Sequence, residues 1–127
     1  MIKSRRIEKV SSLLKKEISL IFMYELNDDL ILENFISITK IDLTADLQYC
    51  KIFISSSANE IIKNKIIDLL NSKKNIIRHY LSKRISMKRV PDLVFRKDKV
   101  LDEGLAVLKV LDELRFKEKG SNKLLED

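Results

Sequence analysis

The sequence predicts an α+β domain in which a three-stranded sheet packs on helices. Apolar residues recur at steps of three and four in several long stretches, as in amphipathic helices. Between these stretches, segments rich in Ile, Phe and Thr alternate apolar and polar residues, as strands do. The chain has 127 residues, of which 45% are hydrophobic, with one Pro and two Gly. This composition is typical of one globular, helix-rich domain that needs no disulfide or metal to fold.

The first helix is expected from Arg5 to about Leu26. Its apolar positions lie three or four residues apart, at Ile7, Val10, Leu14, Ile18 and Ile21. Ser4 is a suitable N-cap, and the sequence NDD at 27–29 indicates the loop that ends the helix.

Two strands are expected within residues 34–56, with a turn at TAD, 44–46. In the first strand, Ile36 and Ile38 share one face and Ile41 and Leu43 share one face, but the step from 38 to 41 is odd. A bulge near Thr39 or Lys40 would turn all four inward. In the second strand Cys50, Ile52 and Ile54 point to one side, which makes Cys50 a packed residue and not a nucleophile.

Two helices are expected next, separated by the sequence NSKKN at 71–75. Serines near residue 56 can cap the first, whose apolar side holds Ile62, Ile66, Leu69 and Leu70. The second covers 76–86 and has an apolar half made of Ile76, Ile77, Tyr80, Leu81 and Ile85. Asn71 or Asn75 could adopt a left-handed backbone and produce a sharp corner between the helices.

Pro91 disfavours helix at Val90, and Leu93 and Phe95 alternate with polar residues in a third strand. A last helix is expected from the spacing of leucines at 101, 105, 108, 111 and 114. The single domain should therefore span 1–116, and residues 117–127 should form a polar, flexible tail.

The positive charge is concentrated in one stretch of the sequence. The net charge is +6, while residues 71–91 contain seven Lys or Arg, one His and no acid, so that the rest of the chain sums to 6 − 7 = −1. An excess of this kind predicts an anionic partner, with nucleic acid first and a membrane surface second. A general abundance of Lys, Ile and Asn offers another explanation, because codon bias can produce basic runs without a binding role.

Several kinds of site lack the residues they require. His79 is the only histidine and is expected on the polar side of its helix, away from the inward Cys50, so a Cys–His pair is not expected. One His and one Cys leave too few ligands for a metal site, and neither glycine lies in a phosphate-binding loop. We expect no enzyme activity, no cofactor and no metal. The absence of a membrane-spanning run and of a secretory signal predicts a cytoplasmic location.

The basic residues can be placed on the expected helices. Arg78, His79, Ser82 and Lys83 fall on the polar half of their helix, whereas Arg84 falls within the apolar arc, so that either the helix ends there or its head reaches out to solvent. Lys73 and Lys74 lie at the corner, beside helix amides that attract phosphate. The predicted contact set consists of Lys73, Lys74, Asn75, Arg78, Lys83, Lys88 and Arg89. Arg5, Arg6 and Lys9 are secondary candidates, because helix starts are often simply solvated.

The order and spacing of four stretches over residues 6–108 resemble the ribosome-binding factor A family. These are RIEKVSSLLKKEISLIF, ISITKIDLTADLQYCKIFIS, IIRHYLSKRISMKRVPDLVFRKD and the glycine of EGL, Gly104. The resemblance implies a KH-like fold of type II topology, in the order α-β-β-α-kink-α-β-α, with an Ala-x-Gly kink between two helices. That kink aligns with Lys73-Lys74-Asn75. The Asp-Pro-Arg usual after the first helix reads Asp28-Asp29-Leu30, and Val100 replaces a common serine.

The resemblance implies a non-enzymatic factor that binds 16S ribosomal RNA on the immature 30S subunit. Such a factor supports late processing near the RNA 5′ end, is linked to growth in the cold, and acts as a monomer. A ribosome-associated GTPase that promotes its release is a candidate partner, and no membrane is involved. Two alternatives stay open. The leucine-rich last helix could dock a protein partner, or the chain could bind nucleic acids generally, although it has no recognisable motif for duplex DNA.

Overall fold

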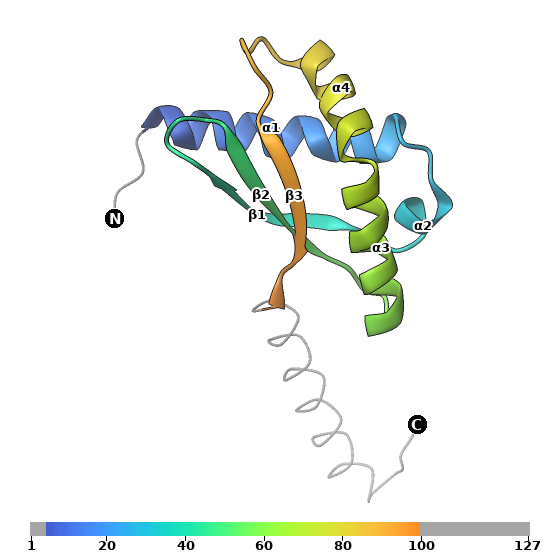
Figure 1. The fold of residues 1–127 in the computed structure, drawn as a ribbon. Coiled ribbons are helices and arrows are strands. Elements are labelled where there is room, and N and C mark those ends of the chain that lie inside the picture. The colour runs from blue at the N-terminus through green and yellow to red at the C-terminus, as the bar shows by residue number, and fades with distance from the viewer. Residues whose placement is uncertain (1–4, 100–127) are drawn as a thin grey trace, which may run out of the picture. The chain divides into compact units, whose positions relative to one another are not determined.

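The computed structural model describes residues 5–99 (Figure 1). Its elements follow the expected order, with one additional short helix. They are α1 (Arg5–Tyr24), α2 (Asp29–Leu32), β1 (Ser37–Leu43), β2 (Tyr49–Ser55), α3 (Glu60–Ser72), α4 (Lys74–Arg84) and β3 (Asp92–Lys97). The expected last helix, the domain end at residue 116, the tail at 117–127 and the cap at Ser4 lie outside the described residues.

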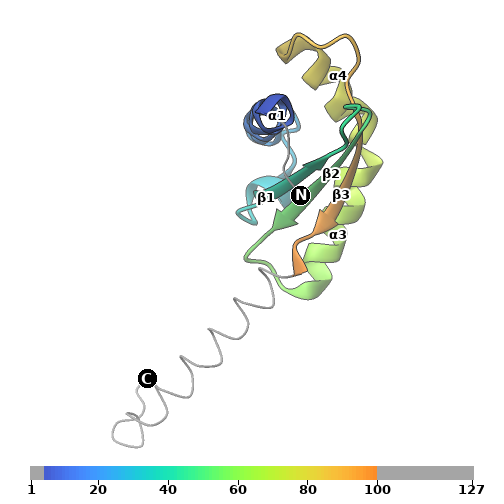
Figure 2. The same cartoon turned by 90° about the vertical axis from the view of Figure 1, so that its left-hand side faces the viewer.

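The three strands form one sheet in the order β1-β2-β3. β1 and β2 are antiparallel, as a hairpin requires, whereas β2 and β3 are parallel. A parallel pair needs a long crossover, and the helices α3 and α4 provide it. Figure 2 shows α3 running alongside β3, with which it is in contact.

Only one face of the sheet carries the core. Along β2 the buried Cys50 and Ile52 alternate with the exposed Tyr49 and Lys51, as predicted. The helix α1 contributes fully buried side chains to the same core, and its Phe22 ring lies 6.0 Å from the Phe95 ring of β3. Burial of such aliphatic and aromatic surface is the main term that stabilises a domain of this size.

The predicted bulge in β1 is confirmed. The pairing register with β2 shifts between Ile38 and Lys40, so Ile38, Ile41 and Leu43 are all buried on the core face. Without the extra residue, Ile41 and Leu43 would point to the opposite face from Ile38.

The segment NDD at 27–29 is not only the loop that follows α1, because its last residue, Asp29, begins a further helix. The Asp28 carboxylate accepts a hydrogen bond from the Leu30 amide at 2.9 Å and caps the four-residue helix α2. Its single turn buries Ile31 and is too short to show a helical period in the sequence. The cap of α3 was also misassigned, because the Asn59 side chain, and not a serine, accepts a hydrogen bond from the Ile62 amide.

The prediction of a left-handed asparagine between α3 and α4 is wrong. The junction is Lys73, at φ −102° and ψ 11°, and neither Asn71 nor Asn75 has positive φ. The Lys73 amide is shared between the carbonyls of Leu69 and Leu70, at 3.0 and 3.1 Å, so the last turn tightens without any left-handed residue. In Figure 1 α4 continues upward from α3, and the junction is a bend, not a sharp corner.

Asn71 instead connects α3 to β3. Its side-chain nitrogen donates to the Phe95 carbonyl at 3.0 Å, and its side-chain oxygen accepts from the Phe95 amide at 2.8 Å. Because β3 is an edge strand, these two bonds satisfy backbone groups that the sheet leaves without a strand partner.

Replacing Asn71 with Ala should lower the free energy of unfolding by about 2 kcal/mol, because both Phe95 backbone groups lose their partner in a half-buried site. Urea unfolding followed by circular dichroism measures the change. Asn64→Ala is the matched control, since Asn64 is exposed on the same helix. Equal stability of the two variants would show that the two hydrogen bonds between Asn71 and the Phe95 backbone do not stabilise the fold.

Candidate nucleic-acid interface

The predicted contact residues lie in three adjoining places. The first is the kink, made of Lys73, Lys74 and Asn75, and the second is the exposed face of α4. The third is the connection from α4 to β3, where it meets the start of α1. We call the three together the basic surface.

At the kink, Lys74 and Asn75 are exposed and Lys73 is half-buried. No side chain caps α4 at its N-terminus. The first amides of a helix have no acceptor within the helix and lie at the positive end of its dipole. Two lysines beside these amides favour binding of a phosphate group.

The exposed face of α4 connects the kink to the third place. Asn75, His79 and Lys83 follow one another at steps of four and are all exposed. Over the 11 residues of α4 this face runs about 16 Å. Ile76 lies on it as well, with 48% of its surface exposed, although the sequence placed it in the apolar half. The exposed side of α4 is therefore cationic at both ends with an apolar position near its start.

The connection forms one wall of a groove of about 490 Å³. Lys88 and Arg89 line it together with Arg6 of α1 and the loop between β1 and β2. Arg5 and Lys9, on the same turns of α1, are exposed. Three cationic side chains and one carboxylate, that of Asp46, line the groove, so its lining has a net positive charge. Arg89 also lies 4.0 Å from the Asp92 carboxylate, whereas Arg6 and Lys88 have no carboxylate partner among the described residues.

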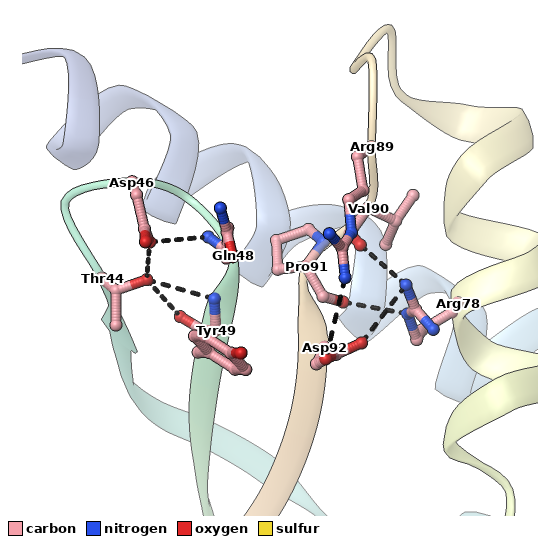
Figure 3. A network of polar contacts seen from close by, with 9 residues as sticks. All are labelled: Thr44, Asp46, Gln48, Tyr49, Arg78, Arg89, Val90, Pro91 and Asp92. Carbon is pink, nitrogen blue, oxygen red and sulfur yellow. Dashed lines mark hydrogen bonds and ion pairs between the residues drawn. The ribbon is translucent and has the colours of Figure 1, made fainter.

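The loop between β1 and β2 is held by its own side chains (Figure 3). The Thr44 hydroxyl donates to the Asp46 carboxylate at 2.7 Å, and the Gln48 amide donates to the same oxygen at 3.1 Å. These two hydrogen bonds hold the pKa of Asp46 below its ordinary value, and the bond from Thr44 has the larger effect. Leu47 completes the loop with a left-handed backbone at φ 63°. The turn expected at 44–46 therefore extends to residue 48.

Arg78 does not have the free, outward side chain that the helical pattern predicted. Its Nε donates to the Pro91 carbonyl at 3.0 Å and its Nη2 to the Val90 carbonyl at 2.9 Å. Nη2 also lies 3.4 Å from Asp92 Oδ1, and 29% of the side chain is exposed. Figure 3 shows the guanidinium directed at the backbone that enters β3. Arg78 thus fixes the connection that carries Lys88 and Arg89.

Arg84 is also a structural residue. The helix α4 ends at Arg84, and its guanidinium binds two carboxylates of α1 and the turn after it, Glu25 at 3.0 Å and Glu17 at 3.2 Å. The hydrogen bond to Glu25 is the largest contribution that raises the pKa of Arg84. The expectation that the helix ends at Arg84 is confirmed, and the arginine head binds carboxylates instead of extending into solvent. It joins α4 to α1.

The sequence interpretation did not include the loop 46–48 in the site. No local signal could have placed it there, because the Asp92 amide donates to the Gln48 carbonyl at 2.9 Å and brings the loop to the start of β3. That contact follows from the parallel pairing of β2 with β3, which begins at Tyr49 and Asp92.

The residues considered for catalysis lie apart from one another. Cys50 is 1% exposed within the sheet, and burial, followed by the charge of Asp42, raises the pKa of its thiol to about 12. His79 is exposed on α4, where its ring contacts Tyr80. Residues 5–99 contain no group of His, Cys, Asp or Glu that could hold a metal ion. In the same part of the chain, no helix combines the length and apolar character that crossing a bilayer requires.

Comparisons with known proteins give one result. The family model for ribosome-binding factor A matches residues 6–111. The ribosome-binding factor A of Prochlorococcus marinus (strain AS9601) is 56% identical over 117 residues, which cover 92% of this chain and 90% of the relative.

Solved structures agree on the fold. The crystal structure of ribosome-binding factor A from Thermus thermophilus matches with a TM-score of 0.60 at 16% identity, over 71% of this chain and 92% of that one. A Thermus thermophilus homology model fitted into the cryo-EM map of a 30S complex matches with a TM-score of 0.56 at 18% identity, over 68% and 88%. The expected KH-like arrangement, with its kinked helix pair, is confirmed. The chain belongs to the ribosome-binding factor A family.

Proposed function

We propose that this chain binds 16S ribosomal RNA on the immature 30S subunit and assists a late step of maturation near the RNA 5′ end. The observation that carries the proposal is the basic surface, which joins the kink, the exposed face of α4 and the groove beside α1. The family supports it, and the matching Thermus thermophilus homology model was fitted into the map of a 30S complex.

The chemistry of the basic surface suits folded RNA. The deep groove of an RNA helix hides its base edges, so proteins bind its phosphates and its shape. Lysines on an exposed helix and amides at a helix start bind phosphates without reading sequence. We assign the contacts to nine residues, and Arg78 positions some of them. The nine are Arg5, Arg6, Lys9, Lys73, Lys74, Asn75, Lys83, Lys88 and Arg89.

The function proposed needs no reaction at the protein. The factor stabilises an RNA arrangement and then leaves, acting as a monomer in the cytoplasm, where a GTPase promotes its release. Its value to the cell should be greatest in the cold, where misfolded RNA rearranges slowly.

Sedimentation of cell extract on a sucrose gradient tests the proposal. Antibody detection should find the chain with free small subunits and their precursors and not with complete 70S ribosomes. Equal amounts in both fractions would contradict a role in maturation. A competition assay supplies the control for general binding, since small-subunit RNA should displace the chain from a labelled RNA fragment at lower concentration than duplex DNA does.

A further inference from the structure

The end of the domain away from the basic groove carries an exposed apolar patch. Four of the eight large apolar side chains exposed within the described part of the chain belong to residues 23–35. They are Met23, Tyr24, Leu32 and Phe35. Met23, Leu32 and Phe35 line one groove of about 190 Å³ between the end of α1, α2 and the start of β1. We call these four residues the α1–α2 patch.

Phe35 stands out in the patch. Its backbone is left-handed at φ 48°, which is unfavourable for a bulky side chain, and 80% of its surface is exposed. Burial of the ring within the domain therefore does not compensate for the strained backbone. Strain of this kind is concentrated at sites that bind ligands or partners.

The segment that forms the patch is acidic, and two of its acids are exposed. The segment from Glu17 to Thr39 contains five acids and no Lys or Arg. Glu17 and Glu25 bind Arg84, and Asp28 caps α2. Asp29 and Glu33 are exposed at the two ends of α2, the helix that contributes Ile31 and Leu32 to the groove. An apolar groove with a negative rim is complementary to a segment that carries apolar side chains between Lys or Arg.

The same charges argue against other occupants. Carboxylates at the rim repel the phosphates of RNA and of anionic lipids. Two copies of this chain facing each other through this patch would bring the two acidic rims together. The patch is also remote from the basic groove, because Arg6 and Met23 are separated by 17 residues of one helix, or about 26 Å.

We propose that the α1–α2 patch docks a protein partner through a lysine- and arginine-rich amphipathic segment, while the basic surface binds RNA. This inference rests on the proposed function, since it places the partner on the small ribosomal subunit. The chain would then bridge a subunit protein and the RNA through the two ends of α1.

Binding to two targets separates this inference from the proposed function. Affinity of the full chain is measured for small subunits and for protein-free 16S RNA. Phe35→Asn removes the ring and keeps a residue that accepts a left-handed backbone. It should weaken binding to subunits about tenfold, as loss of an aromatic anchor does, and leave RNA binding unchanged. Glu33→Lys should weaken subunit binding as well.

Ile61→Asn is the control, because Ile61 is equally apolar and 68% exposed but lies on α3, outside the patch. It should leave both affinities unchanged, and thermal unfolding should show that all variants are folded. Wild-type affinity of both patch variants for subunits would overturn the docking proposal and leave RNA binding intact. A wild-type chain that binds neither target would overturn the proposed function, and this inference with it.

A photo-reactive phenylalanine analogue at position 35 identifies the partner's chemistry. After irradiation on small subunits, mass spectrometry should find cross-links to a Lys- and Arg-rich segment of a subunit protein. Cross-links to RNA, to a second copy of this chain or to an acidic protein segment would overturn the proposal, and so would their absence.

Discussion

Charge reversal of Lys74, Lys83 and Lys88 together should lower the affinity for 16S RNA on the order of a hundredfold near physiological salt. Lys74 lies at the kink, Lys83 on the exposed face of α4 and Lys88 in the basic groove. If these lysines contact phosphates as proposed, each substitution by Glu removes a neutralising cation and adds a charge that repels the phosphate. The slope of log affinity against log salt concentration should fall by about 2 to 3, since each lost phosphate contact reduces it by roughly 0.7 to 0.9.

The fold should tolerate this triple substitution. The three lysines are exposed, and within residues 5–99 none of their side chains takes part in a hydrogen bond or ion pair of the structure. Charge reversal of Lys15, Lys16 and Lys65 is the matched control, because these lysines are also exposed but lie outside the basic surface. Titrations at several salt concentrations, with thermal unfolding of each variant, measure the effect. An equal loss in the control would mean that net charge determines binding.

The elements of the fold could be predicted because each leaves a local pattern. The period of apolar residues in α1 and the alternation in β2 depend only on neighbours in the sequence. Even the bulge in β1 was predictable, since Ile38 and Ile41 can share a face only if one residue is extra. The helix α2 could not be predicted from the sequence, because a single turn shows no helical period. The parallel direction of β3 could not be predicted either, because it depends on the path of α3 and α4.

The charge of the candidate site was predictable, but the surroundings of its side chains were not. A helical wheel gives the direction of a side chain from its own helix and says nothing of what else lies there. Arg78 points away from the apolar half of α4. The chain entering β3 lies in that direction, and its carbonyls accept hydrogen bonds from the guanidinium. Ile76 shows the opposite case. It lies in the apolar arc of the helical wheel, yet no neighbouring element buries it, and 48% of its surface is exposed. Lys73 forms the kink with a negative φ of −102°, so neither glycine nor asparagine is required there.

Arg78→Ala should lower the free energy of unfolding by about 3 kcal/mol, because charged donors to two backbone carbonyls are lost in a half-buried place. Lys83→Ala is the control on the same helix, and its stability should stay near that of the wild type because Lys83 is exposed. Urea unfolding measures both. RNA affinity should fall for the two variants for different reasons, since Lys83 is one of the proposed phosphate contacts while Arg78 holds the connection that carries Lys88 and Arg89.

Arg78→Lys distinguishes the two roles. Lysine keeps the charge, but its single ammonium group does not reproduce the planar set of donors that reaches Val90 and Pro91. If Arg78 positions the connection, the Lys variant should lose stability much as the Ala variant does, and RNA affinity should follow stability and not charge. Wild-type stability of Arg78→Ala combined with full RNA binding by Arg78→Lys would instead make Arg78 a direct phosphate contact. The two hydrogen bonds to the start of β3 favour the positioning role, because a guanidinium engaged there has fewer donors left for RNA.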